Sequence, residues 1–278
     1  MKHIFLNLKR FDVPKDLGGV NTIAPVNQWG KYIINSIRDK LRKYSAEEIE
    51  FVVYMPEAHI IPAVEALDPE GRLSIGSQGV YREDISAGEN FGAFTTNCTA
   101  SAVKAMGCSS AIIGHCEERK DKAGIMREAG VNDRAAVDRI LNKEIKAALS
   151  VGLRVLYCIG ESSDEQADRE NILKGQIEIG LKDVDRKDAV IAYEPVWAIG
   201  PGKSAPDREY IAKTAAYIKE VSGGMDVVYG GGLKRENAEM LASIPEISGG
   251  LIALTRFTGD IGFYPDEYLE IVKIYMGY

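Results

Sequence analysis

Cysteine and histidine are scarce in this chain, and those present lack the spacing of a metal site or a disulfide framework. Among the 278 residues there are four cysteines and three histidines. No C-x-x-C pair occurs among the cysteines, which are Cys98, Cys108, Cys116 and Cys158. Because no cluster of histidine, cysteine and carboxylate has ligand spacing, we expect no bound metal. The few unpaired cysteines predict a reduced, cytoplasmic protein.

Long apolar runs and an excess of positive charge are also missing. No run approaches the roughly 20 residues of a membrane helix, and the N-terminal segment has too short an apolar core for a secretory signal. Lysine and arginine number 34 against 41 aspartates and glutamates, a net charge of −7. This balance argues against nucleic acid or an anionic membrane as the partner. An anionic small ligand is not excluded, because a site can be locally positive.

What the chain does contain is a regular alternation of two patterns. Short β-rich runs are followed by longer amphipathic stretches at helical spacing, such as Asp133–Val151, Ser163–Leu181 and Asp207–Val221. The β-rich runs are His3–Leu6, Phe51–Met55, Leu73–Val80, Ala111–Gly114, Leu153–Ile159, Ala189–Tyr193, Asp226–Tyr229 and Gly250–Leu254. Alternation of this kind is typical of parallel βαβ units. Eight units predict an α/β protein with one domain over residues 1–278, a (β/α)8 TIM barrel. A doubly wound open sheet is the competing architecture, although no G-x-G-x-x-G follows the first run.

Chemically useful side chains appear where several of these runs end. Asn7 and Lys9 follow the first run, His115 the fourth and Glu194 the sixth, and three glycines follow Tyr229. In a barrel these ends meet at one mouth, where active sites are built. Taken singly, a solvated lysine, a structural histidine, a helix-capping glutamate and a glycine turn are ordinary explanations. Their convergence at one end favours a site.

This combination suits the removal of a proton from a carbon beside a carbonyl. A carboxylate acts as the base, and a hydrogen-bond donor and a positive charge stabilise the enediolate that forms. A neutral imidazole at a helix N-terminus can donate without adding charge. An apolar lid that excludes water raises the basicity of the carboxylate. No organic cofactor is needed for such a proton transfer.

Six segments resemble the motifs of one enzyme family, triosephosphate isomerase, and the likeness runs from about residue 3 to 275. The segments are "NLK" at 7–9, "GAFT" at 92–95, "GHCEER" at 114–119, "CIGE" at 158–161, "IAYEPVWAIGPGK" at 191–203 and "YGGG" at 229–232. The resemblance implies that Glu194 is the base, that His115 is the electrophile, and that Lys9 supplies positive charge. Asn7 and Glu117 would hold Lys9.

The resemblance also implies a hinged lid, a phosphate site and a dimer. Residues 195–197 would form the rigid hinge of the lid, 198–202 its tip and 203–205 its far hinge. The phosphate would bind the backbone of Gly200 and Gly232, with Cys116 and Tyr229 as supporting residues. Phe94 and Thr95 would belong to the loop that completes the partner's site in a homodimer.

Departures from the family pattern gather on the phosphate side. Gly232 stands where the family has a serine, and Pro201 stands where the lid has a threonine. Leu254 and Thr255 occupy the positions of a glycine pair whose amides bind phosphate, and several extra residues follow. Arg256 is a new cation that can take a phosphate bidentately. The alternative is a surface arginine on an inserted loop.

Further departures lie near the histidine and the expected dimer loop. The serine after His115 is replaced by Cys116, a poorer hydrogen-bond partner. Glu118 replaces an arginine and Asn97 replaces a glutamate, so the charges that meet across the family dimer are both changed. The segments 82–91 and 120–133 are longer than usual.

Several functions remain open on these grounds. The first is an isomerase that interconverts glyceraldehyde 3-phosphate and dihydroxyacetone phosphate, a step of glycolysis and gluconeogenesis. The second is a paralogous isomerase of another small sugar phosphate, such as a tetrulose phosphate. The third is a non-catalytic sugar-phosphate sensor, against which Lys9, His115 and Glu194 together speak. A Schiff-base aldolase using Lys9 is remote, because its anionic neighbours would raise its pKa.

Overall fold

The computed structural model describes residues 1–200 and 203–278, and its strands form a closed parallel barrel. The last strand pairs with the first, which excludes the open doubly wound sheet and confirms the predicted barrel. The strands are β1 (Lys2–Asn7), β2 (Ile49–Met55), β3 (Leu73–Ser77), β4 (Ser110–Ile113), β5 (Arg154–Ile159), β6 (Ala189–Tyr193), β7 (Val227–Tyr229) and β8 (Gly249–Ile252). Each predicted β-rich run overlaps one of them.

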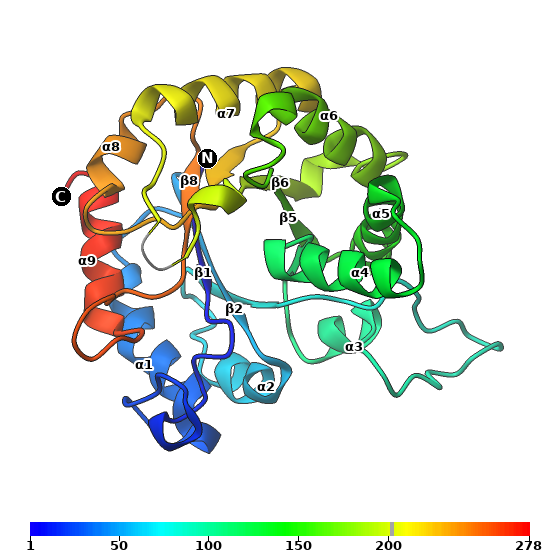
Figure 1. The fold of residues 1–278 in the computed structure, drawn as a ribbon. Helices are drawn as coiled ribbons and strands as arrows, with labels where there is room; N and C mark the ends of the chain where they lie inside the picture. The colour runs from blue at the N-terminus through cyan, green and yellow to red at the C-terminus, as the bar shows by residue number, and fades with distance from the viewer. Residues whose placement is uncertain (201–202) are drawn as a thin grey trace.

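Helices surround the barrel on its outer side (Figure 1). They are α1 (Trp29–Leu41), α2 (Glu57–Glu65), α3 (Ala100–Ala105), α4 (Cys116–Glu128), α5 (Arg134–Ser150), α6 (Arg169–Gly180), α7 (Arg208–Ser222), α8 (Ala238–Ala242) and α9 (Pro265–Tyr275). The aspartates that precede α5 and α7 cap them, because their side chains accept hydrogen bonds from the first turn. The three predicted amphipathic stretches are therefore confirmed as α5, α6 and α7.

Two predicted boundaries were too wide, and local side-chain hydrogen bonds explain both. The α6 helix begins at Arg169 rather than at residue 163, because Ser162 bonds Asp164 and Glu165 in a turn. The β3 strand ends at Ser77 rather than at Val80, because the Ser77 hydroxyl donates to the Gly79 carbonyl at 3.0 Å. Serine in such positions competes with regular secondary structure.

The core has two layers, one inside the barrel and one between the strands and the helices. Side chains such as Phe5, Tyr54 and Leu156 fill the interior, and their neighbours along each strand pack against the helices. Strands buried on both faces carry nearly continuous apolar runs, which is why the β-rich segments are recognisable in the sequence. In the described part of the chain, no helix combines the length and the apolar character needed to cross a membrane.

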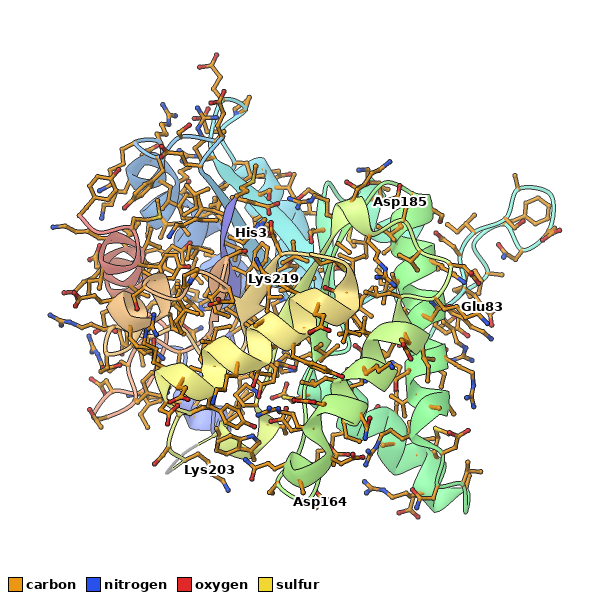
Figure 2. The ribbon with its side chains drawn as sticks, turned by 90° about the horizontal axis from the view of Figure 1, so that it is seen from above. His3, Glu83, Asp164, Asp185, Lys203 and Lys219 are labelled. Carbon is orange, nitrogen blue, oxygen red and sulfur yellow. The ribbon has the colours of Figure 1, made fainter. Side chains whose placement is uncertain are left out.

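A polar cluster around the buried His3 lies at the amino-terminal end of the barrel. His3 Nδ1 lies 2.8 Å from Glu50 and Nε2 lies 3.0 Å from Asp226, and Arg154 also pairs with Glu50. Figure 2 shows His3 and Asp185 toward this end and Lys203 and Asp164 toward the other. Charge pairs at this end of a barrel contribute to stability, whereas active sites are built at the opposite, carboxyl-terminal end.

Candidate active site

One cavity lies at the carboxyl ends of the strands and has a volume of about 450 Å³. Most of the residues expected in the site line it: Asn7, Lys9, His115, Glu194, Gly200 and Gly232. The sequence reasoning did not single out four others that line it, Phe11, Lys234, Phe257 and Ile261. These come from loops without a recognisable motif, so only the fold reveals them.

Glu194 is held at the tip of β6 as a buried carboxylate. It is 1% exposed, its Oε1 lies 3.2 Å from His115 Nε2, and its Oε2 accepts the Cys116 N–H at 2.8 Å. Burial raises the pKa of Glu194, although the neighbouring His115 opposes the shift. Gly230 must be a glycine here, because a Cβ would lie 2.7 Å from Glu194 Cγ. The carboxylate is thus basic and fixed in position.

His115 directs one ring nitrogen at Glu194 because it caps α4. Its Nδ1 accepts the Glu117 N–H at 3.3 Å, so the proton of a neutral imidazole sits on Nε2. His115 is therefore oriented to donate a hydrogen bond into the cavity.

Lys9 is held in a strained backbone conformation at the end of β1. Its φ is 42°, which is uncommon outside glycine, and strain of this kind gathers at functional sites. Its N–H donates to Asn7 Oδ1 at 3.1 Å, and its ammonium lies 2.8 Å from Glu117. Gln78, which the sequence reasoning missed, donates its amide to both Asn7 Oδ1 and the Lys9 carbonyl.

The first hinge of the expected lid is anchored to a buried carboxylate. Trp197, in the 3-10 turn Val196–Ala198, donates its Nε1–H to Glu161 Oε1 at 2.8 Å. The same oxygen accepts the hydroxyls of Tyr193 and Tyr210. The "CIGE" motif contains Glu161, but its role as an anchor appears only in the structure. Ile199 and Gly200 lie over the cavity, and the Pro201 substitution falls outside the described residues.

Cys116 affects Glu194 through its backbone rather than through its thiol. The Cys116 N–H is the hydrogen-bond donor to Glu194, so the weak donor strength of the thiol matters less than expected. One ligand atom each of His115, Cys116 and Glu194 lie within 4.8 Å of one another, a grouping that the sequence spacing did not reveal. Burial raises the pKa of the Cys116 thiol to about 12, which makes it a poor metal ligand.

The side of the cavity where the sequence predicts phosphate binding is built from loops after β6, β7 and β8. Gly232 has a φ of 99°, a conformation that L side chains rarely adopt. Tyr229 is fully buried beneath this loop, and a Cβ on Gly231 would lie 2.4 Å from its hydroxyl. Tyr229 therefore supports the glycine turn and does not line the cavity.

The loop after β8 closes on itself through two of its amides. The N–H groups of Thr255 and Arg256 both point to the Gly262 carbonyl, at 3.2 and 3.1 Å. The Arg256 side chain pairs with Glu267 Oε1 at 2.8 Å and stacks on Tyr264. The structure does not bring Arg256 into the cavity, whereas Leu254 does line it.

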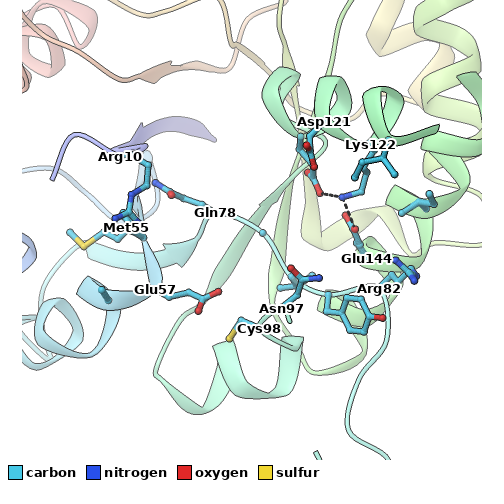
Figure 3. Close-up of a pocket in the computed structure, with 18 of the residues that line it drawn as sticks. Arg10, Met55, Glu57, Gln78, Arg82, Asn97, Cys98, Asp121, Lys122 and Glu144 are labelled. Atoms are coloured by element: carbon cyan, nitrogen blue, oxygen red, sulfur yellow. Dashed lines mark hydrogen bonds and ion pairs between the residues drawn. The ribbon is translucent and has the colours of Figure 1, made fainter. Parts of the chain in front are cut away.

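The segment between β3 and α3 projects from the barrel, with Glu83 on it (Figures 1 and 2). It carries the half-buried Phe94 and the exposed Thr95. Beside its base lies a second cavity of about 750 Å³ (Figure 3). That cavity contains Asn97 together with Lys122, which bonds Glu118 at 2.6 Å within the same chain.

A buried carboxylate with a raised pKa, an imidazole and an ammonium group face one cavity at the carboxyl end of a (β/α)8 barrel. This arrangement defines a class, the barrel enzymes that move a proton beside a carbonyl carbon. Comparisons with known proteins narrow the class. A family model described as triosephosphate isomerase matches residues 27–273, and the chain belongs to the triosephosphate isomerase family. It is thus an isomerase.

Individual relatives agree with this assignment. The triosephosphate isomerase of Chlorobium luteolum is 38% identical over 228 residues, 78% of this chain and 84% of that protein. That of Lactiplantibacillus plantarum is 32% identical over 253 residues, 86% and 90% of the two chains. The crystal structure of the Bartonella henselae enzyme matches the fold with a TM-score of 0.72, covering 99% of each chain at 22% identity.

Proposed function

We propose that this isomerase interconverts glyceraldehyde 3-phosphate and dihydroxyacetone phosphate, with Glu194 as the base. The observation that carries the proposal is the environment of Glu194 Oε1. This atom is buried and accepts no hydrogen bond from the described residues, and it lies 3.2 Å from His115 Nε2. A desolvated carboxylate oxygen that lies in the cavity beside an imidazole donor is placed to take a proton from carbon.

The proton moves between two neighbouring carbon atoms, and donors must stabilise the negative oxygen of the intermediate. Glu194 takes a proton from the carbon beside the carbonyl, and the electron pair of that C–H bond moves into an enediolate. The His115 Nε2–H and the Lys9 ammonium stabilise the negative oxygen. Glu194 then returns the proton to the neighbouring carbon, while the oxygen-bound proton moves between the two oxygens. The aldose and the ketose differ only in these two proton positions.

The lid formed by the segment after Glu194 protects this intermediate from water. An exposed enediol phosphate can eliminate its phosphate, so closure preserves the product. The hydrogen bond from Trp197 to Glu161 fixes one end of the lid. The other end reaches Lys203, which also lines the cavity.

A second candidate function is the isomerisation of another small acyclic sugar phosphate. The altered phosphate side favours keeping it, because Leu254 and Phe257 line the cavity where a glycine pair is expected. A coupled assay that runs both triose phosphates beside four-carbon ketose phosphates separates the two. A higher kcat/KM for a triose phosphate supports the first function. No turnover of any of these compounds would leave the sugar-phosphate sensor.

We also propose that the protein is a cytoplasmic homodimer that serves glycolysis and gluconeogenesis. The projecting Phe94–Thr95 loop and the second cavity, both on one side of the barrel, support an exchange of loops between two copies. Gln78 lines that cavity and also holds Lys9, so a loop seated there would act on the site.

If the protein is a dimer, its molecular mass in solution should depend on concentration, and its turnover should depend on the Phe94–Thr95 loop. Sedimentation at micromolar concentration should show a dimer, and Thr95→Glu should give monomers with lower kcat. Glu89→Ala on the same projecting loop serves as the control and should stay dimeric. A fully active wild-type monomer would contradict the proposal.

A further inference from the structure

We infer that Lys234 binds the phosphate group of the substrate by charge, in place of the serine hydroxyl that this chain lacks at Gly232 and of the Thr255 amide that is bonded within its own loop. The inference rests on the proposed function, since it names how that substrate is held. Lys234 follows the glycine turn after β7. It lines the same cavity as Lys9, which comes from the loop after β1. The sequence favours Arg256, on the loop after β8, as the phosphate-binding cation, but the Arg256 side chain pairs with Glu267.

The side chain of Lys234 folds back over Gly232. A Cβ placed on Gly232 would lie 3.3 Å from Lys234 Cε, so the absence of a side chain at Gly232 leaves room for the lysine. The Lys234 ammonium lies 4.1 Å from the centre of the Phe257 ring, which stabilises a cation over its face. The loss of the serine and the position of the lysine are thus structurally linked.

The backbone beneath Lys234 is fixed by one side chain. The Lys234 N–H donates to Asn237 Oδ1 at 2.8 Å, and Asn237 Nδ2 donates to the Gly232 carbonyl at 3.0 Å. This clamp holds the glycine turn and the start of the lysine side chain together. A long flexible cation that is fixed at its base and supported near its end loses less entropy on binding.

Lys234 is also available for an anion. Across residues 1–200 and 203–278, no carboxylate lies within ion-pair distance of its ammonium. By contrast, Lys9 pairs with Glu117, Arg235 with Glu270 and Arg256 with Glu267. A cation without a partner at the edge of a cavity favours an anionic ligand.

The charge inside the cavity points the same way. Three lysines and a single carboxylate line it: Lys9, Lys203, Lys234 and Glu194. The chain as a whole carries a net charge of −7. A locally positive cavity in an acidic protein concentrates an anion there. The Thr255 amide, at the second position of the expected glycine pair, is taken by the Gly262 carbonyl, and a charged side chain can supply the contact that is lost.

The test compares Lys234→Ala with Arg235→Ala, which removes the same charge one residue away on the outer surface. Lys234→Ala should raise KM for the phosphorylated substrate roughly 10- to 150-fold, as expected for the loss of one charge-assisted contact. Lys234→Arg should recover most of the affinity. Unphosphorylated glyceraldehyde should be turned over by Lys234→Ala and wild type at similar, low rates. Arg235→Ala should leave every one of these values unchanged.

Inorganic phosphate gives a readout that does not need turnover. Phosphate should raise the thermal midpoint of wild type and Arg235→Ala, and should do so much less for Lys234→Ala. If Lys234→Ala keeps both its KM and its protection by phosphate, the inference is overturned. A different outcome is that wild type isomerises no triose phosphate, yet phosphate protects wild type against unfolding and does not protect Lys234→Ala. In that case the proposed function fails and the anion site stands.

Discussion

The two halves of the barrel mouth are built in different ways. In the proton-transfer half, Glu194 and His115 are 1% and 9% exposed and extend directly from β6 and β4. In the phosphate half, Lys234 and Phe257 belong to loops, and Phe257 is 44% exposed. Chemistry that depends on atoms within about 3 Å is positioned by strands, whereas the remote part of the substrate is held by segments that can be rebuilt.

The loop after β8 shows how such a rebuilding is tolerated. Extra residues between Thr255 and Gly262 form a small antiparallel bridge, and Lys15 from the loop after β1 pairs with Asp260 on it. The loop satisfies its own backbone groups and therefore does not disturb β8. The phosphate site changes its chemistry without moving the strands that carry the base.

The largest expected effect lies in the proton-transfer half. Glu194→Asp withdraws the carboxylate by about one bond and should lower kcat at least ~10²-fold, with little change in KM. Steady-state kinetics on both triose phosphates measures it, with Glu209→Asp on the exposed face of α7 as the control. If Glu194→Asp changed only KM, Glu194 and Lys234 would no longer differ in the kinetic step that they affect. Near-normal turnover would remove Glu194 from the mechanism.

A smaller effect should come from the hinge that connects the two halves. Trp197→Phe keeps the ring but removes the hydrogen bond to Glu161, and kcat should fall roughly 10-fold, the scale of one bond to a charged group. Tyr210→Phe removes another donor to the same oxygen from α7, outside the lid. Rapid kinetics should show slower lid closure only for Trp197→Phe. Equal losses in both variants would assign the effect to Glu161 itself.

The sequence predicts one half of the mouth better than the other, and the reason is physical. Glu194, His115 and Lys9 follow buried strands, whose apolar runs can be read directly and whose ends must meet in a closed barrel. Lys234 and Phe257 are brought together by long-range loop packing that no local pattern encodes. The sequence favours Arg256 as the phosphate-binding cation of the inserted loop. Its pairing with Glu267 depends on where α9 begins, which the local sequence around Arg256 does not reveal.

The buried Glu194 and the half-buried Glu50 allow a test of whether the proton-transfer half reduces the stability of the fold. Burial raises the pKa of Glu194, and the neighbouring His115 only partly opposes the shift. Burial also acts on Glu50 at the other end of the barrel, but the hydrogen bond from His3 and the charge of Arg154 outweigh it and lower its pKa. The same residue type is thus strained at one end and stabilising at the other.

Glu194→Gln should abolish turnover yet raise the thermal midpoint by about 2–4 °C, the equivalent of about 1 kcal/mol. The folded pKa of Glu194 lies above the unfolded one, so its ionised form weakens folding at any pH above the folded pKa. As the pH falls through that value toward 4.5, the pKa of an unperturbed glutamate, wild type becomes protonated and the advantage of the variant disappears. Thermal unfolding between about pH 4 and 8 measures the difference.

Glu50→Gln should act in the opposite direction and serves as the matched control. Its folded pKa is lowered, so the ionised group stabilises the fold above its unfolded pKa, and this contribution is lost as the pH falls through the folded value. The variant should therefore unfold at a lower temperature than wild type near neutral pH, and the gap should narrow in acid. If both substitutions destabilise the protein equally at every pH, the buried carboxylate of Glu194 carries no strain, and the two ends of the barrel do not differ as argued.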